Sequence, residues 1–71
     1  MLVPVLVTVK NGFVDQATIA KSGEHLEELF ISASMMNGLV PNETDLENGF
    51  VSMTIGTDQI TISMTWAEAS Q

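Results

Sequence analysis

The chain has 71 residues and no cysteine, so it is expected to form one small domain, residues 1–71, without disulfide bonds or thiolate-bound metal. Nine acidic residues stand against two lysines and no arginine, which gives a net charge of −7 at pH 7. Proteins that bind nucleic-acid phosphates use lysine and arginine to displace counterions. This chain has too few of these residues, so direct nucleic-acid binding and binding to anionic membranes are disfavoured. The absence of cysteine also fits a reducing compartment, and we expect a cytoplasmic protein.

Residues 2–20 are predicted to form a β-hairpin. The apolar run of residues 2–9 is broken by Pro4 and is far shorter than the about 20 residues that a membrane span needs, so it indicates a strand. Asn11-Gly12 follows, and both residue types accept the positive φ angles of a type I′ turn. Counting back from this turn predicts two faces that are both largely apolar. One face pairs Val3, Val5, Val7 and Val9 with Ala20, Thr18, Gln16 and Val14, and the other pairs Leu2, Pro4, Leu6 and Thr8 with Lys21, Ile19, Ala17 and Asp15.

Residues 22–37 are predicted to form the single helix. Ser22 is a good N-cap, and Gly38 stands where a C′ glycine would end the helix in the left-handed conformation. Apolar residues recur at the i, i+3, i+4, i+7 spacing of one buried stripe, so the helix is expected to pack on a sheet. The stripe consists of Leu26, Leu29, Phe30, Ala33 and Met36 or Asn37.

Residues 38–49 are predicted to form an acidic loop, because Asn-Gly pairs bracket the segment and Pro41 interrupts it. Glu43, Asp45 and Glu47 alternate, so an extended chain would place all three on one side. These oxygen donors would suit a hard cation, but the ligand order of an EF-hand loop is absent, and no metal site is expected.

Residues 50–66 are predicted to form a second hairpin, followed by a small polar tail, residues 67–71. With Thr57-Asp58 as the loop, Ile55 pairs with Ile60, and every apolar side chain falls on one face with every serine and threonine on the other. The same register pairs Met53 with Ile62 and Val51 with Met64. A slip of one residue would destroy this agreement, so the two faces are strongly specified.

The order of these elements predicts an α+β fold, ββαββ, with a four-stranded antiparallel sheet and one helix packed on one face. The second hairpin has one polar face, whereas both faces of the first hairpin are apolar and there is only one helix to cover them. One apolar face of the first hairpin is therefore expected to stay uncovered, and such a patch usually marks an interaction surface.

No residue pattern indicates an enzyme. The only histidine, His25, lies near Ser22, but the serine is better explained as the helix cap, and no oxyanion hole or strained nucleophile turn is indicated. The acids fall where solvent is expected rather than in a pocket that would separate two pKa values. We therefore expect no catalytic residue and no cofactor.

Two groups of acids suggest a first function, binding to another protein that is basic. Acids one helical turn apart lie about 5 to 6 Å from each other, a spacing of the same order as successive phosphates. The groups would therefore block a nucleic-acid-binding channel as a nucleic-acid mimic. In size and composition alone the chain is similar to phage-encoded inhibitors of host enzymes, such as anti-CRISPR and anti-restriction proteins. The predicted contact residues are Glu24, Glu27 and Glu28 on the helix, and Glu43, Asp45 and Glu47 in the loop.

The alternative function is structural. The uncovered face of the first hairpin would join two or more copies of the chain, and the acids would then serve solubility. The predicted self-association residues are Val3, Val5 and Val7 on one face of the hairpin, or Leu6 with Leu2 and Pro4 on the other. Both functions use the surplus apolar face of the first hairpin, and they are compatible because a dimeric inhibitor would have every feature described above.

Overall fold

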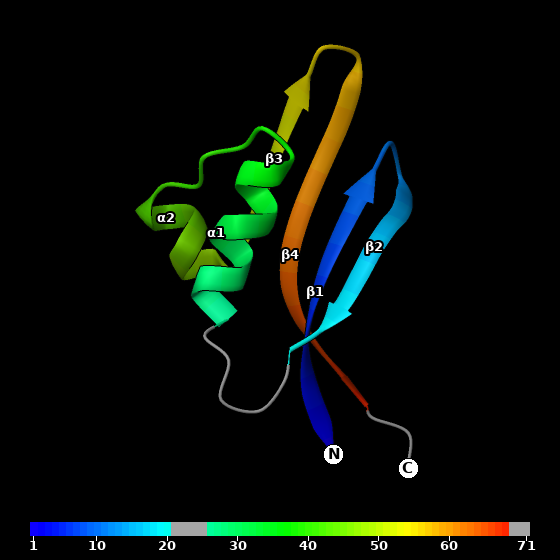
Figure 1. Ribbon diagram of the computed structural model, residues 1–71, viewed down its shortest axis with the longest axis vertical. Helices are drawn as coiled ribbons and strands as arrows, with labels where there is room; N and C mark the ends of the chain where they lie inside the picture. Colours follow the sequence, from blue (N-terminus) through cyan, green and yellow to red (C-terminus); the bar gives the residue numbers. More distant parts are fainter. Residues whose placement is uncertain (21–25, 69–71) are drawn as a thin grey trace.

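The described part of the chain forms four strands and two helices (Figure 1). The structure is a computed structural model and describes residues 1–20 and 26–68. Its elements in chain order are β1 (Leu2–Lys10), β2 (Phe13–Ile19), α1 (Leu26–Met36), α2 (Glu43–Asn48), β3 (Phe50–Ile55) and β4 (Asp58–Glu68).

The strands form one antiparallel sheet in the order β2-β1-β4-β3, and the predicted ββαββ fold is confirmed. The helices lie on one face of this sheet (Figure 1). There α1 packs on β1 and β4, and α2 packs on β3, which leaves the outer strand β2 without a helix over it. The core between the layers consists of Leu6, Phe30, Leu39, Val51, Ile60 and Ile62.

The second hairpin turns at Gly56-Thr57 and not at the predicted Thr57-Asp58. Ile55 pairs with Asp58, and Met53 with Ile60, so the observed register differs from the prediction by two residues. Gly56 has φ +63°, as expected for the first central residue of a type II′ turn. Because side chains alternate with a period of two, the shift leaves the predicted apolar and polar faces unchanged.

A β-bulge in the first hairpin changes which residues of β2 share a face. The predicted type I′ turn is present, and Val9 pairs with Val14 as predicted, but the register then shifts between Thr8 and Val9. The next pair is Thr8 with Gln16, so Asp15 is the extra residue of the bulge. From there on the predicted pairing is wrong by one residue, and Ala17 and Ile19 join the face of the valines.

The end of α1 is a Schellman motif. The backbone N–H of Gly38 donates to the Met35 carbonyl at 3.0 Å, and the N–H of Leu39 donates to the Ser34 carbonyl at 2.9 Å. Gly38 has φ +84°. The turn delivers Leu39, which is fully buried, into the core directly after the helix. Ser34 is also fully buried, and its Oγ donates to the Phe30 carbonyl at 2.7 Å.

Substituting Gly38→Ala is expected to lower the free energy of unfolding by about 1 to 3 kcal/mol. An alanine there would take a strained left-handed conformation, and its Cβ would lie 3.2 Å from Cδ1 of Ile55. Gly12→Ala is the matched control, because Gly12 has a similar φ of +83° but no atom within 4 Å of the added Cβ. Urea unfolding curves of both variants separate the effect of backbone strain from that of the contact with Ile55. An equal loss of stability in the two variants would mean that the contact with Ile55 does not contribute.

Two segments predicted to be irregular are regular. Residues 43–48 of the predicted acidic loop form the helix α2, capped by Asn42. Ala67 and Glu68, assigned to the tail, continue β4 and pair with Val3 and Leu2 of β1. Within residues 26–68, neither helix is long and apolar enough to cross a membrane. The predicted helix cap, Ser22, lies outside the described residues.

Candidate functional site

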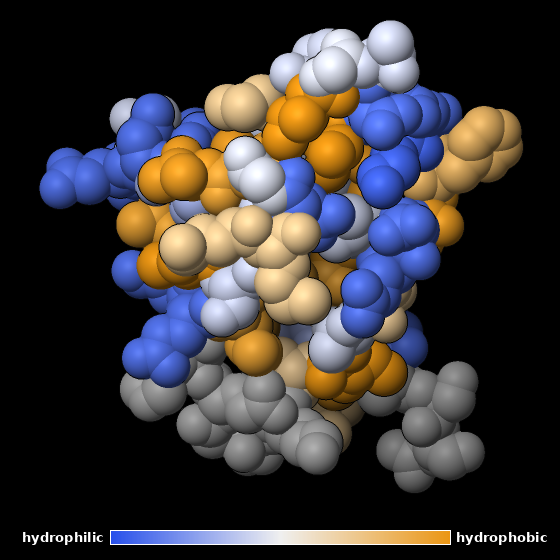
Figure 2. All heavy atoms as spheres, turned by 45° about the horizontal axis from the view of Figure 1, so that its top comes forward, coloured by the Kyte–Doolittle hydropathy of each residue, from blue (hydrophilic) through white to orange (hydrophobic). Residues whose placement is uncertain are grey.

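The acids of the two predicted groups lie on two neighbouring helices. Glu27 and Glu28 are exposed in the first turn of α1, while Glu43 and Glu47 are exposed one turn apart on α2. Glu24 lies outside the described residues. In Figure 2 hydrophilic residues project along the left margin, the side on which Figure 1 draws α2, with hydrophobic residues between them.

The structure brings acids from both predicted groups to one place. Glu27 of α1 lines a shallow depression together with Glu43, Leu46 and Glu47 of α2, and we call these residues the acidic hollow. Among the described residues the only salt bridge joins the amino group of Met1 to Glu68, so no cation among them pairs with the hollow. The hollow therefore combines negative charge with one half-buried leucine.

Asp45 differs from the other acids because its carboxylate holds the start of α2. Its Oδ2 accepts the backbone N–H of Asn42 at 2.9 Å, and Oδ1 of Asn42 accepts the N–H of Asp45 at the same distance. This reciprocal pair is a capping box. The expectation that Glu43, Asp45 and Glu47 lie on one side of an extended segment is therefore wrong. Asp45 caps the helix α2 and does not belong to the hollow.

The predicted self-association residues divide between the two faces of the sheet. Leu6 is buried in the core on the helix side, so its assignment to the self-association surface is wrong. Val3, Val5 and Val7 lie on the other face, over which neither α1 nor α2 lies, but Val5 is only 8% exposed there and Val3 and Val7 are half-buried. We call this surface the valine face, and its members are Val3, Val5, Val7 and Val9 of β1 with Val14, Ala17 and Ile19 of β2.

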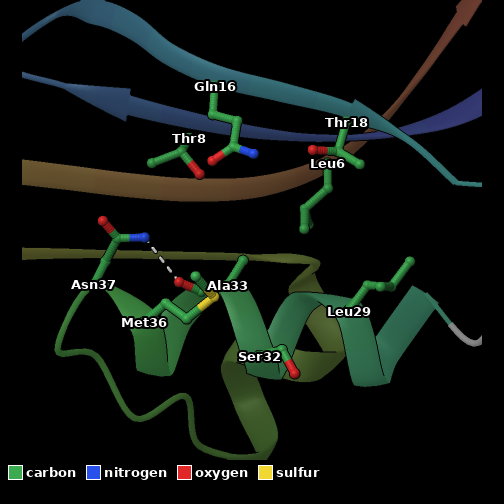
Figure 3. Close-up of a pocket in the computed structure, with 9 residues that line it drawn as sticks. All are labelled: Leu6, Thr8, Gln16, Thr18, Leu29, Ser32, Ala33, Met36 and Asn37. Atoms are coloured by element: carbon green, nitrogen blue, oxygen red, sulfur yellow. Dashed lines mark hydrogen bonds between the residues drawn. The ribbon is translucent and has the colours of Figure 1, made fainter.

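A cavity of about 190 Å³ lies between α1 and the strands β1 and β2 (Figure 3). It exists because the bulge places Gln16 and Thr18 on the helix side of β2, beyond the reach of α1. Leu6 and Ala33 belong to its apolar lining, and the Asn37 amide at one end donates to the Ala33 carbonyl at 2.8 Å. The cavity has no ionisable side chain in its lining and is smaller than the about 300 to 1,000 Å³ typical of ligand sites.

No constellation for metal or nucleophilic chemistry is present in residues 1–20 and 26–68. Within these ranges no group of three histidine, cysteine or acidic side chains is close enough to hold a metal ion. Ser22 and His25, considered from the sequence, lie outside the described residues. Asp15, an acid that a serine–histidine pair would need beside it, is exposed at the bulge of β2.

The valine face and the acidic hollow are the two candidate functional surfaces, and they lie on different layers of the fold. The hollow is built by the helices, whereas the valine face is the side of the sheet turned away from them. Comparison with protein-family models, curated proteins and solved structures finds no match to this chain.

Proposed function

We propose that this protein is a non-catalytic binding module whose acidic hollow docks on a basic, nucleic-acid-binding surface of a larger protein and blocks it. The observation that carries this proposal is the meeting of Glu27 with Glu43 and Glu47 around Leu46. Acids from two sequence segments thus act on one partner surface, and the half-buried leucine beside them offers an apolar contact.

The charge of the hollow favours a basic partner for two physical reasons. Clustered carboxylates repel one another, and a partner that brings lysine or arginine between them relieves this repulsion. A negative surface on a chain of net charge −7 also attracts a positive partner over the Debye length and speeds association. An inhibitor of the phage type, directed at a nuclease or a restriction enzyme, would use both effects.

Competition with DNA tests the proposal. Wild-type protein is expected to displace a labelled DNA duplex from a Cas9-type nuclease or from a restriction endonuclease, followed by fluorescence anisotropy. The displacement should weaken steeply between about 0.05 and 0.3 M salt, because exposed charges are screened. A basic protein that does not bind nucleic acid is the control for unspecific attraction.

Charge reversal assigns the effect to the hollow. Glu47→Lys is expected to weaken competition by about tenfold or more. A tenfold change corresponds to the loss of about 1.4 kcal/mol of binding free energy, which one charged contact can supply. Asp15→Lys changes the net charge equally but lies on β2, away from the helices, and should change competition little. Equal losses from the two variants, or no displacement from either enzyme, would contradict the proposal.

A further inference from the structure

Neither of the two described helices covers the valine face, and its residues on β2 are exposed. Val14 and Ile19 are 67% and 64% exposed, and both helices lie on the opposite side of the sheet. The bulge is responsible for this composition, because an unbulged hairpin would place Gln16 and Thr18 beside the valines of β1. The bulge thus adds the exposed Ala17 and Ile19 to a face on which the valines of β1 are half-buried, or buried in the case of Val5.

Charge is segregated away from this face. Two acids of the sheet, Asp58 and Glu68, pair with Ile55 and Leu2. Because side chains alternate along each strand, both acids lie on the helix side of the sheet. The remaining acid of the sheet, Asp15, is the extra residue at the bulge. The acidic hollow is on the helices, so the carboxylates do not oppose contact between two valine faces at close range.

The face also has two halves of different chemistry. Its β2–β1 half carries the aliphatic side chains, while the other half carries Thr61, Ser63 and Thr65 on β4 and also includes Phe50 of β3, the partner of Ser63. Two copies of such a surface can be related by a two-fold axis that lies midway between the two sheets, parallel to both and perpendicular to the strands. This operation places β1 on β1 and β4 on β4, so that like chemistry meets like.

We propose that two copies of this chain pack face to face through the valine face, with the helices and acidic hollows on the outside of the dimer. The two sheets form a sandwich about 10 Å thick, with strands crossing at about 30°. The occupant is a second copy because the same two-fold operation matches both the aliphatic and the hydroxyl half. A basic partner would instead leave its cations against aliphatic side chains.

The size of the face fits this proposal. Four strands about 4.8 Å apart and about seven residues long give a flat footprint of about 440 Å² per copy, or about 900 Å² for the pair. This footprint is close to the about 1,000 Å² that separates specific interfaces from packing contacts. The interface is at the small end of the range, so the dimer is expected to dissociate on dilution.

Sedimentation equilibrium over a concentration series tests the dimer. Wild-type protein is expected to approach twice the 7.7 kDa mass of one chain at high concentration. Ile19→Lys should weaken association by about a hundredfold, because the two-fold axis brings one added charge from each copy into the interface. Phe13→Lys is the matched control, since Phe13 is 78% exposed on the same strand but pairs with Lys10 on the helix side.

Circular dichroism confirms that each variant is folded, and Val14→Lys replaces Ile19→Lys if the latter fails this check. A wild-type mass of one chain at every concentration would overturn the proposal, as would an equal effect of Phe13→Lys. The dimer and the proposed function can fail separately. Competition with DNA depends on Glu47, and dimerisation should be unchanged by Glu47→Lys.

Discussion

The variant Phe30→Ala is expected to lose a large share of its free energy of unfolding at 25 °C. Phe30 is fully buried at the centre of the contact between α1 and the sheet, where it belongs to one cluster with Leu39 and Ile62. Truncation of such a side chain costs about 3 to 5 kcal/mol, because transfer free energy is lost and a cavity remains. A chain of 71 residues has a free energy of unfolding of about 4 to 10 kcal/mol, so little stability is left.

Far-UV circular dichroism and urea titration measure this loss. Met36→Ala is the control on the same helix, because Met36 is 86% exposed and its truncation should change stability by less than about 0.5 kcal/mol. A Phe30→Ala protein with the unfolding midpoint of the wild type would mean that the helix does not pack on the sheet through this residue.

An equally large effect is expected from Ile62→Asp. Ile62 is fully buried on β4, between Thr8 of β1 and Val51 of β3. None of the core residues around it offers an ionic partner, so the introduced carboxylate would be buried without compensation. We expect the variant to be unfolded at pH 7. Thr61→Asp is the control, because Thr61 is the next residue on the same strand but lies on the opposite face and is half-exposed.

The destabilisation by Ile62→Asp should depend on pH. Burial raises the pKa of the introduced carboxyl above the about 3.9 of an unfolded chain. The stability difference from wild type should therefore be smallest below about pH 3.9 and should grow as the pH rises through the raised pKa. Thermal unfolding at a series of pH values measures this difference. A penalty that is independent of pH would indicate that position 62 is open to water.

The two hairpins differ in how far their sequences specify them. In the second hairpin, apolar and hydroxyl residues alternate strictly, so both faces could be predicted even though the turn was misplaced. In the first hairpin, β1 is apolar on both sides, so the alternation contains no signal for the register of β2. The bulge at Asp15 was therefore missed, and Leu6 was assigned to the wrong surface.

The candidate site was predictable in part. The acids formed two groups in the sequence, but the meeting of Glu27 with Glu43 and Glu47 depends on how α2 packs beside α1, which no local pattern specifies. A signal for α2 itself was present. Asn42 is followed three residues later by Asp45, the spacing of a capping box, and Gly49 ends the helix with φ +76°.

The central claim, that the bulge builds an apolar face on which two copies meet, is tested most directly by the absolute mass in solution. Light scattering at about 0.05 M and about 1 M NaCl separates apolar from ionic association, because salt screens charge. We predict a dimer at high protein concentration in both buffers, more stable at high salt because repulsion between the acidic chains is screened. A mass of 7.7 kDa at both salt concentrations, or a dimer that dissociates at high salt, would contradict the account.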